Sequence, residues 1–330
     1  MSRSPHPPFP SLQTVQTSNS GDSRDYRKST FYRWLYTPRS FLLILKAWRV
    51  LGARGAWVIS RFLALSFAVI HPQTIRAIRS NIALLDPARA TFGAAFRLLV
   101  NQSECISSFG RLATVPPDEL MGLIGEQHGI GHLEGIRREG RGCLLVTGHL
   151  GFFEIGGPVI TSLGFPMTVL TYREPTPELT RWRADFRARW GVGTIVVGSD
   201  PFSAFEVVQA IRKGHFVAML ADRPYNAEDM LPVDLPHGRI PFSKGPALLS
   251  ILTGTPVVPV GITTGPDGKF RVESKAPILP PDGSKSREEA IALMTRRIAA
   301  ALIPMFLKEP EQWYHFAPLG LPASSTSSHS

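Results

Sequence analysis

The chain has 330 residues, of which 43% are hydrophobic, so it can bury a large core and is not disordered throughout. It carries 36 Lys and Arg against 26 Asp and Glu, a net charge of +10. This excess lies in residues 1–80, whereas residues 81–330 are neutral. A uniformly basic protein would suggest nucleic acid, whereas a neutral body with a basic, apolar amino-terminal arm favours an anionic membrane surface.

The two cysteines, Cys105 and Cys143, provide neither a disulfide framework nor a CxxC metal spacing. Both lie in apolar or helical-looking stretches. We therefore predict structural thiols in a reducing compartment.

Residues 1–30 are rich in Ser, Pro and Thr without periodicity, which predicts a disordered tail. A second disordered tail is predicted at residues 321–330. The early arginine is not followed by an apolar core and a small-residue cleavage site, so the amino-terminal stretch is not typical of a secretory signal.

Residues 31–75 are predicted to form an amphipathic helical segment that associates with a membrane. The longest uncharged run, residues 62–75, has 14 residues and contains a proline, which is short of the roughly 20 apolar residues that a spanning helix needs. On an ideal helix four basic residues fall within an arc of about 140° and leave the rest to Leu, Trp and Phe. These residues are Lys46, Arg49, Arg54 and Arg61. The alternative is an amphipathic helix that packs against the core of a soluble protein.

The main domain is predicted to span residues 76–320. Residues 72–140 are expected to form helices with polar faces, with breaks near Pro87 and Pro116-Pro117. The glycines from Gly129 to Gly135 do not match the dinucleotide-binding fingerprint, because their spacing is wrong and no strand is expected before them. No P-loop, HExxH or GxSxG motif occurs in the chain.

Residues 143–147 form a short apolar run bounded by glycines, which predicts a buried strand. His149 follows this strand, and a helix is expected from Phe152, so that Glu154 lies five positions after the histidine. A straight helix would place the two side chains about 140° apart, so they can pair only if His149 lies in the turn before the helix. In that arrangement Glu154 would fix the imidazole tautomer and support the imidazolium. The alternative is an ordinary loop histidine and a glutamate that favours the helix dipole.

After this motif, strands and helices alternate to the end of the chain. This pattern predicts an α/β fold with a mostly parallel mixed sheet flanked by helices. Strands are expected at 167–171, 194–197, 216–220, 257–262 and 269–273, and helices at 177–190, at 201–213 and after residue 244.

Polar residues follow three of the expected strands, the first being His149 after the strand at 143–147. Arg173 follows the strand at 167–171, and Asp222 and Arg223 follow the strand at 216–220. The carboxyl ends of parallel strands meet at one edge of the sheet, where ligands bind, so we expect these side chains near His149. Further along, Gly238 and Arg239 are predicted to supply donors to a phosphate or an oxyanion.

Several motifs occur in an order that resembles the late acyltransferases of lipid A biosynthesis, a branch of the lysophospholipid acyltransferase superfamily. The motifs are Ala77-Ile78-Arg79-Ser80-Asn81-Ile82, Gly148-His149-Leu150-Gly151-Phe152-Phe153-Glu154 (the HX4E motif), Tyr172-Arg173, Leu220-Ala221-Asp222-Arg223, Gly238-Arg239, Leu252 to Val260, and Pro310-Glu311-Gln312-Trp313-Tyr314. The resemblance extends from about Ala77 to Tyr314, about three quarters of the chain. Three positions depart from the family pattern: Phe152-Phe153 replaces Asn-Trp, Asp222-Arg223 replaces Asp-Gln, and Tyr314-His315-Phe316 replaces basic residues.

The resemblance implies an acyltransferase in which His149 is the general base and Glu154 orients it. Arg173, Asp222, Arg223, Gly238 and Arg239 are expected to bind substrate. The expected partners are an acyl carrier protein, or CoA, as the acyl donor, a membrane glycolipid such as a lipid A precursor as the acceptor, and the membrane surface itself. No cofactor, metal or nucleic acid is expected. The expected location is the cytoplasmic face of a bacterial inner membrane, in peripheral or monotopic form.

Three alternatives remain. The first is a non-catalytic homologue that only binds lipid. The second is an acyltransferase for another lipid, such as a phosphatidylinositol mannoside, an aminolipid or a lysophospholipid. The third is a metal-dependent hydrolase with His149 and Glu154 as ligands, which is disfavoured because His128, His132 and His215 lack a ligand spacing.

Overall fold

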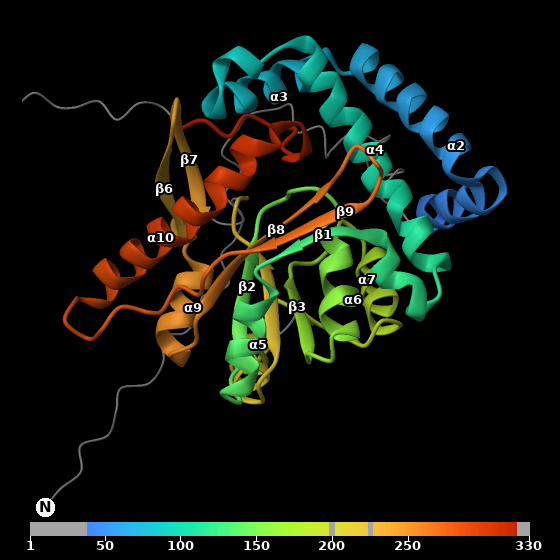
Figure 1. Ribbon diagram of the computed structural model, residues 1–330. Helices are drawn as coiled ribbons and strands as arrows, with labels where there is room; N and C mark the ends of the chain where they lie inside the picture. The colour runs from blue at the N-terminus through green and yellow to red at the C-terminus, as the bar shows by residue number, and fades with distance from the viewer. Residues whose placement is uncertain (1–37, 198–201, 224–226, 322–330) are drawn as a thin grey trace, which may run out of the picture.

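The computed structural model describes residues 38–197, 202–223 and 227–321. It confirms the predicted α/β class: a seven-stranded, mostly parallel mixed sheet is flanked by helices (Figure 1). The predicted tails at 1–30 and 321–330 lie outside the described residues, except for Leu321. So does the start of the predicted membrane segment, residues 31–37.

The strand order in the large sheet is β1-β9-β8-β2-β5-β3-β4, and β6 and β7 form a separate antiparallel hairpin. The strands are β1 (Ile124–His128), β2 (Cys143–Thr147), β3 (Met167–Thr171), β4 (Val192–Val196), β5 (Phe216–Leu220), β6 (Met230–Leu235), β7 (Gly238–Ser243), β8 (Val257–Thr264) and β9 (Phe270–Ser274). Strands β8, β2, β5, β3 and β4 are parallel, and β9 runs antiparallel to β8. Because β2, β5 and β3 are neighbours, the loops that follow them leave the same edge of the sheet.

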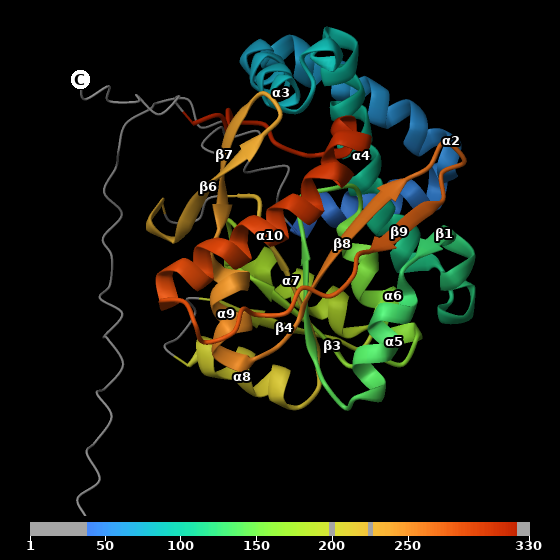
Figure 2. The same cartoon turned by 60° about the vertical axis from the view of Figure 1, so that its left-hand side comes forward.

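Both faces of the sheet are covered, as the continuous apolar strands require. The described helices are α2 (Pro38–Ile70), α3 (Pro72–Leu85), α4 (Phe92–Thr114), α5 (Ile130–Arg138), α6 (Gly156–Ser162), α7 (Pro177–Ala188), α8 (Ser203–Arg212), α9 (Gly245–Thr253) and α10 (Arg287–Lys308). Alternate β2 residues enter different cores: Leu144 and Val146 pack with α8, α9 and α10, whereas Cys143 and Leu145 pack with α5 and α6. Figure 2 shows α10 lying across its face of the sheet.

A helical layer formed by α2, α3 and α4 lies at one end of the sheet (Figure 1). Helix α2 is broken at Gly52, whose φ is 59°, and its second half packs along α4. The contact uses small side chains, since Ser60, Ala64 and Ala68 are the buried residues among the α2 side chains that the structure describes. Arg61 also faces α4 and pairs with Glu104 at 2.9 Å.

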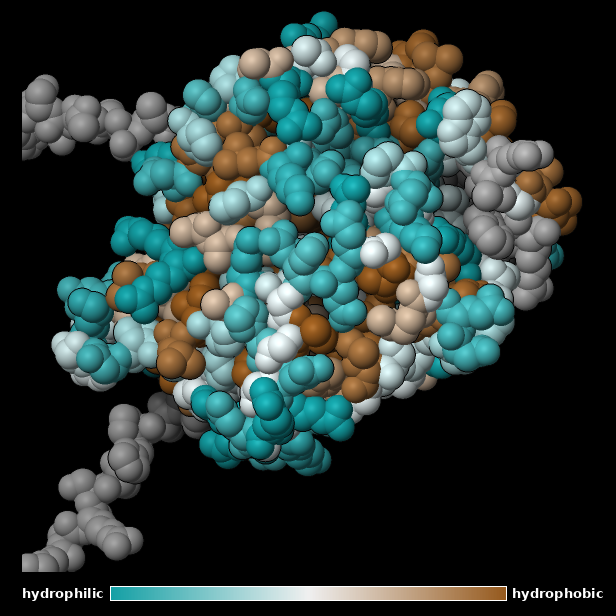
Figure 3. Space-filling view, in the orientation of Figure 1, coloured by the Kyte–Doolittle hydropathy of each residue, from teal (hydrophilic) through white to brown (hydrophobic). Residues whose placement is uncertain are grey.

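Four bulky apolar residues of α2 lie on the opposite side, in contact with solvent. Val58, Phe62, Leu65 and Val69 are 57%, 68%, 54% and 72% exposed. Figure 3 shows apolar side chains gathered over α2 at the upper right of the face in view. Of the predicted basic arc, Lys46 is exposed, while the side chains of Arg49 and Arg54 lie outside the described part.

By length and composition, α10 is the one described helix that could cross a membrane, and the segments 57–70 and 72–85 pass the same test only as a pair bent by 100°. Helix α10 has the character of a core helix, because a row of its residues is buried. This row comprises Ala290, Met294, Thr295, Ile298, Ala299, Leu302, Met305 and Phe306.

Two sequence predictions need correction here. The stretch 72–140 is not all helical, because β1 (Ile124–His128) pairs in parallel with β9. A strand therefore does precede Gly129, contrary to expectation. The polar sequence of β1 hid it, since an edge strand need not be apolar. The wrong glycine spacing still excludes the dinucleotide fingerprint.

Candidate functional site

Two glycines shape the loop that carries His149. Gly151 has a φ of 53°, and a Cβ at this position would lie 2.1 Å from the carbonyl oxygen of Ile262 on β8. A Cβ on Gly148 would lie 2.7 Å from the Oδ2 atom of Asp222. Only glycine fits at these two positions, so the loop can pack closely against β8 and against Asp222.

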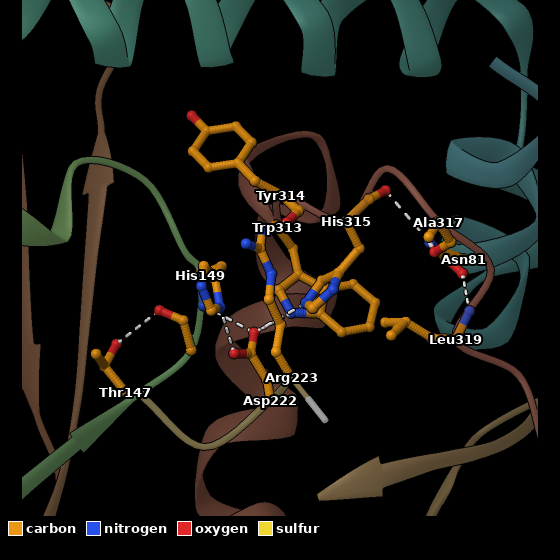
Figure 4. Close-up of polar contacts among 11 residues, drawn as sticks. Asn81, Thr147, His149, Asp222, Arg223, Trp313, Tyr314, His315, Ala317 and Leu319 are labelled. Carbon is orange, nitrogen blue, oxygen red and sulfur yellow. Dashed lines mark hydrogen bonds and ion pairs between the residues drawn. The ribbon is translucent and has the colours of Figure 1, made fainter. Parts of the chain in front are cut away.

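His149 and Asp222 form the centre of the site (Figure 4). The Nδ1 atom of His149 lies 2.7 Å from Oδ1 of Asp222, and the backbone N–H of His149 donates to Oδ2 at 2.7 Å. Asp222 is fully buried, whereas the His149 side chain is 19% exposed. The topology explains the pairing, since the two residues follow the neighbouring strands β2 and β5.

Two further side chains donate to the same carboxylate. The indole Nε1–H of Trp313 reaches Oδ2 of Asp222 at 2.9 Å, and Nε2 of His315 lies 3.0 Å from it. Among the described residues, four N–H groups therefore surround the Asp222 carboxylate, and none of them comes from a lysine or an arginine. A buried carboxylate that accepts several hydrogen bonds keeps its negative charge.

The pKa values follow from these contacts. Burial raises the pKa of Asp222, but His149 and His315 outweigh it and hold this pKa well below its usual range. Burial lowers the pKa of His149 to about 3; Arg223 lowers it as well, while Asp222 raises it. At neutral pH the carboxylate is ionised and the imidazole is neutral. With its Nδ1–H donated to Asp222, the ring keeps a lone pair on Nε2.

Within the described residues, His149, Asp222 and His315 also have the composition of a metal site, with ligand atoms within 4.8 Å of one another. However, Oδ2 of Asp222 accepts the backbone N–H of His149 and the indole N–H of Trp313, and neither group can give up its proton to make room for a metal. Hydrogen bonding therefore accounts for the cluster.

Glu154 occupies a different environment, and the prediction that it orients His149 is wrong. Its Oε1 accepts from Arg183 at 2.5 Å and from Arg187 at 2.6 Å, and its Oε2 accepts from Nε of Arg187 at 3.0 Å. Although burial raises the pKa of Glu154, the two arginines lower it to about 2. Both carboxylate oxygens are thus engaged by α7, and Asp222 takes the place beside the imidazole.

The same arginines organise the loop that follows β3. Arg183 donates to Glu174 at 2.5 Å as well as to Glu154, so it links the segment after Arg173 to the short helix that follows His149. Arg173 is exposed at the carboxyl end of β3. The loops after β2, β5 and β3 therefore leave the same edge of the sheet, as predicted. The sequence did not indicate that arginines of α7 would hold two of these loops together.

The remaining predicted residues fall in two places. Arg223 is next to Asp222, and its Nη2 donates to the carbonyl of Tyr314 at 2.5 Å. Gly238 and Arg239 lie at the turn of the β6–β7 hairpin, where Arg239 faces Asp234 at 3.4 Å and a Cβ on Gly238 would contact Leu84. None of the described contacts joins this turn to His149, since the hairpin meets the site through Ser243, whose N–H donates to the carbonyl of Ala221.

A histidine held by a buried, ionised carboxylate at the carboxyl edge of an α/β sheet is suited to general-base chemistry. The model of the bacterial lipid A biosynthesis acyltransferase family matches residues 24–319. The chain belongs to this family. It is therefore an acyltransferase, as the order of its motifs predicts. Comparison with curated proteins gave no match.

Sequence reasoning missed four supporting residues of this acyltransferase. Arg183 and Arg187 are four positions apart on a predicted helix, and this spacing puts both on one face, but nothing in the sequence named their partner. Trp313 lies in the carboxyl-terminal motif and His315 follows it, and the sequence of this stretch did not indicate where it packs. A pairing over 91 residues, such as that of Asp222 with Trp313, has no local sequence pattern.

Proposed function

We propose that this acyltransferase moves a fatty acyl chain from an acyl carrier protein thioester, or from CoA, to a hydroxyl or amine of a membrane glycolipid such as a lipid A precursor. His149 acts as the general base. One observation carries this proposal: Nδ1 of His149 is bound to a buried, ionised Asp222, which leaves Nε2 as the basic atom.

The reaction needs one proton transfer in each direction. Nε2 of His149 takes the proton from the acceptor hydroxyl while its oxygen attacks the thioester carbonyl carbon. As the tetrahedral intermediate collapses, the carbon–sulfur bond breaks, and the imidazolium returns the proton to the leaving thiolate. Asp222 stabilises the imidazolium between these two steps and stays ionised throughout. The products are an acylated lipid and a free thiol.

Two arginines at the strand ends are proposed to bind the acceptor. Arg173 is exposed after β3, and a guanidinium suits a phosphate or carboxylate. Arg223 lowers the pKa of His149, so an anionic group bound to it would offset this effect and make the imidazole more basic when substrate is present. Gly238 and Arg239 remain predicted substrate contacts, at the tip of the hairpin.

We further propose that the enzyme lies on the cytoplasmic face of a bacterial inner membrane and that the exposed side of α2 enters the lipid. Helix α2 buries its small residues against α4 and turns Val58, Phe62, Leu65 and Val69 outward. Exposure of large apolar residues opposite a buried row of small ones is unfavourable in water and favourable at a lipid interface.

The alternatives make different predictions. A lipid-binding homologue without activity has no use for an ionised carboxylate behind a histidine. An acyltransferase for a phosphatidylinositol mannoside, an aminolipid or a lysophospholipid would use the same base with another acceptor. Mass spectrometry of lipids from cells with and without the protein distinguishes these acceptors by the mass of the lipid that loses its acyl chain.

The test of the mechanism is acyl transfer from a labelled acyl carrier protein into extracted membrane lipid. We expect His149→Ala to lose about 10²- to 10⁴-fold in rate, the typical contribution of a general base. Circular dichroism confirms that the variant is folded, and a chelator is expected to leave the wild-type rate unchanged. Near-normal transfer by folded His149→Ala would refute the mechanism, and inhibition by the chelator would favour a metal.

The test of membrane binding uses substitutions on the exposed side of α2. Phe62→Gln with Val69→Gln should reduce sedimentation with anionic liposomes, and high salt should weaken binding of the wild-type protein by screening its basic charge. Lys46→Gln removes one exposed charge of α2 and no apolar side chain, so it measures the electrostatic contribution separately and should reduce sedimentation less than the double variant. Unchanged sedimentation of the double variant would show that this side of α2 is not the lipid contact.

A further inference from the structure

The segment after α10 packs against the loop that carries His149. The backbone N–H of Gly151 donates to the carbonyl of Gln312 at 2.9 Å, and the N–H of Tyr314 donates to the carbonyl of His149 at 2.8 Å. The Gln312 side chain also binds both backbone groups of Thr264 on β8, at 2.7 and 2.8 Å. Residues 312–319, which we call the carboxyl-terminal strap, therefore pair with the loop backbone on both sides of Leu150, the residue after His149.

The far end of the strap is anchored by a side-chain amide on α3. The side chain of Asn81 donates to the carbonyls of His315 and Ala317 at 3.2 and 2.9 Å and accepts the N–H of Leu319 at 2.9 Å. Asn81 is 2% exposed, so these bonds do not compete with water. Figure 4 shows Asn81 at one end of the strap and His149 at the other, with Trp313 and His315 between them.

From this strap, Trp313 and His315 reach the Asp222 carboxylate. Their exposed fractions are 1% and 3%, and both donate to Oδ2, while Oδ1 faces Nδ1 of His149. The indole of Trp313 is fixed in turn by stacking on Phe306, with ring centroids 5.1 Å apart. The two donors therefore fix the rotation of the carboxylate and direct Oδ1 at the catalytic ring.

We propose that Trp313 and His315 are positioning residues for proton transfer by His149. This inference rests on the proposed function. Neutral N–H groups on Oδ2 hold Asp222 ionised without the full positive charge that an arginine would bring next to the imidazolium. They keep the proton on Nδ1 of His149 and the lone pair on Nε2. The arrangement requires His315 to be the Nε2–H tautomer, since an ionised Asp222 only accepts.

The titratable and charged groups that face His149 are Asp222, Arg223 and His315. Removing the N–H of His315 leaves more negative charge on the carboxylate atoms that face His149. The pKa of His149 should then rise, and the acidic limb of the kcat/KM profile should move to higher pH.

The experiment compares three variants of the full chain in the acyl transfer assay. His315→Leu and Trp313→Phe each remove one donor, and kcat should fall about 10- to 100-fold, the value of one hydrogen bond to a charged group, with little change in KM. His315→Gln keeps an amide N–H near the position of ring Nε2, so its kcat should stay within about threefold of wild type, without a shift of the pH profile. Wild-type kcat and an unshifted profile in folded His315→Leu would overturn the inference, as would equal losses in His315→Gln and His315→Leu.

A measurement on the wild-type protein keeps the inference testable if a variant does not fold. Nitrogen NMR of protein labelled at histidine should show Nδ1–H for His149 and Nε2–H for His315 at neutral pH; any other pair of tautomers overturns it. The His149→Ala assay separates this inference from the proposed function. Active His149→Ala refutes the function, whereas inactive His149→Ala together with fully active His315→Leu and Trp313→Phe refutes only the role of the strap.

Discussion

Asp222 and Glu154 are two buried carboxylates near the same histidine, and their surroundings differ. Asp222 accepts from His149, Trp313 and His315, none of which carries a permanent charge. Glu154 is enclosed by Arg183 and Arg187, which are always charged. Both carboxylates are ionised, but only the first has a partner that can change its protonation state.

Because of this difference, Asp222 and Glu154 have different roles. A carboxylate beside an imidazole can stabilise a charge that appears during a reaction. The charge of a carboxylate between two arginines is already compensated, so it contributes little electrostatic stabilisation to the active site. Its contacts instead hold α7 against the loop after His149. Position in the HX4E motif therefore does not determine the role of Glu154; the neighbours that the fold supplies do.

Asp222→Asn should produce the largest effect. The asparagine can place its NH₂ group against Nδ1 of His149, which moves the ring proton to Nε2 and removes the base. We expect a loss of about 10²- to 10⁴-fold in the single-turnover rate of acyl transfer.

The control for this loss is the fold of the variant, followed by circular dichroism. If folded Asp222→Asn keeps transfer within about tenfold of wild type while Glu154→Gln loses it, the roles of the two carboxylates are the reverse of those inferred here.

Glu154→Gln should act mainly on stability. It leaves Arg183 and Arg187 buried opposite a neutral amide, and breaking a buried pair from one side costs about 3–5 kcal/mol. Urea unfolding measures this change. Glu174→Gln is the matched control, because Glu174 pairs with Arg183 and its side chain is 16% exposed. This substitution should lower the free energy of unfolding by less than Glu154→Gln. An unchanged free energy of unfolding together with lost activity would contradict a structural role for Glu154.

The contributions of His149 and Glu154 to stability should be lost in different pH ranges as the solution is acidified. The pKa of His149 is about 3 in the folded protein against 6.5 ordinarily, so unfolding takes up a proton between these values. Stability should therefore fall as pH decreases from 6.5 to 5, by about 1.4 kcal/mol per pH unit for each full proton taken up. His315, whose pKa is also lowered, contributes with the same sign.

The carboxylates act only at lower pH. The pKa of Glu154 is about 2 against 4.5 ordinarily, so its contribution is complete above about pH 4.5 and is lost as pH falls toward 2. Urea unfolding of His149→Gln between pH 5 and 6.5 should thus show a weaker dependence on pH than the wild type. Glu154→Gln should keep the wild-type slope in this range, and an equal reduction in both variants would contradict the assignment.

Much of the fold was predictable because the strands that form the centre of the sheet are apolar and short. Residues 143–147, 167–171 and 216–220 match β2, β3 and β5 as predicted. The polar strand β1 was not predictable, because its pairing with β9 depends on residues about 146 positions away. The β6–β7 hairpin was missed for a related reason, since its apolar run could equally precede a helix.

The site was predictable to the extent that it depends on strand ends. His149 and Asp222 were both expected at the carboxyl edge, and the adjacency of β2 and β5 joins them. Their pairing was not predicted, because the nearby Glu154 offered a local partner. The arginines that bind Glu154 come from α7, and Trp313 and His315 come from the end of the chain. Only the folded structure therefore shows which carboxylate pairs with His149.

The smallest effect on stability is expected where a glutamate–arginine pair is exposed to solvent. Glu104 accepts from Arg61 at 2.9 Å between α4 and α2, with the two side chains 38% and 37% exposed. Water solvates both partners when the pair is broken, so Glu104→Gln should lower the free energy of unfolding by less than about 1 kcal/mol. Glu104 is the better residue to change, because Arg61 also stacks on Trp57 at 3.7 Å and its removal would lose that contact too. The same urea experiment then compares one chemical change, glutamate to glutamine beside arginine, at a buried and an exposed site. A loss at Glu104 as large as that at Glu154 would mean that burial does not explain the difference between the two carboxylates.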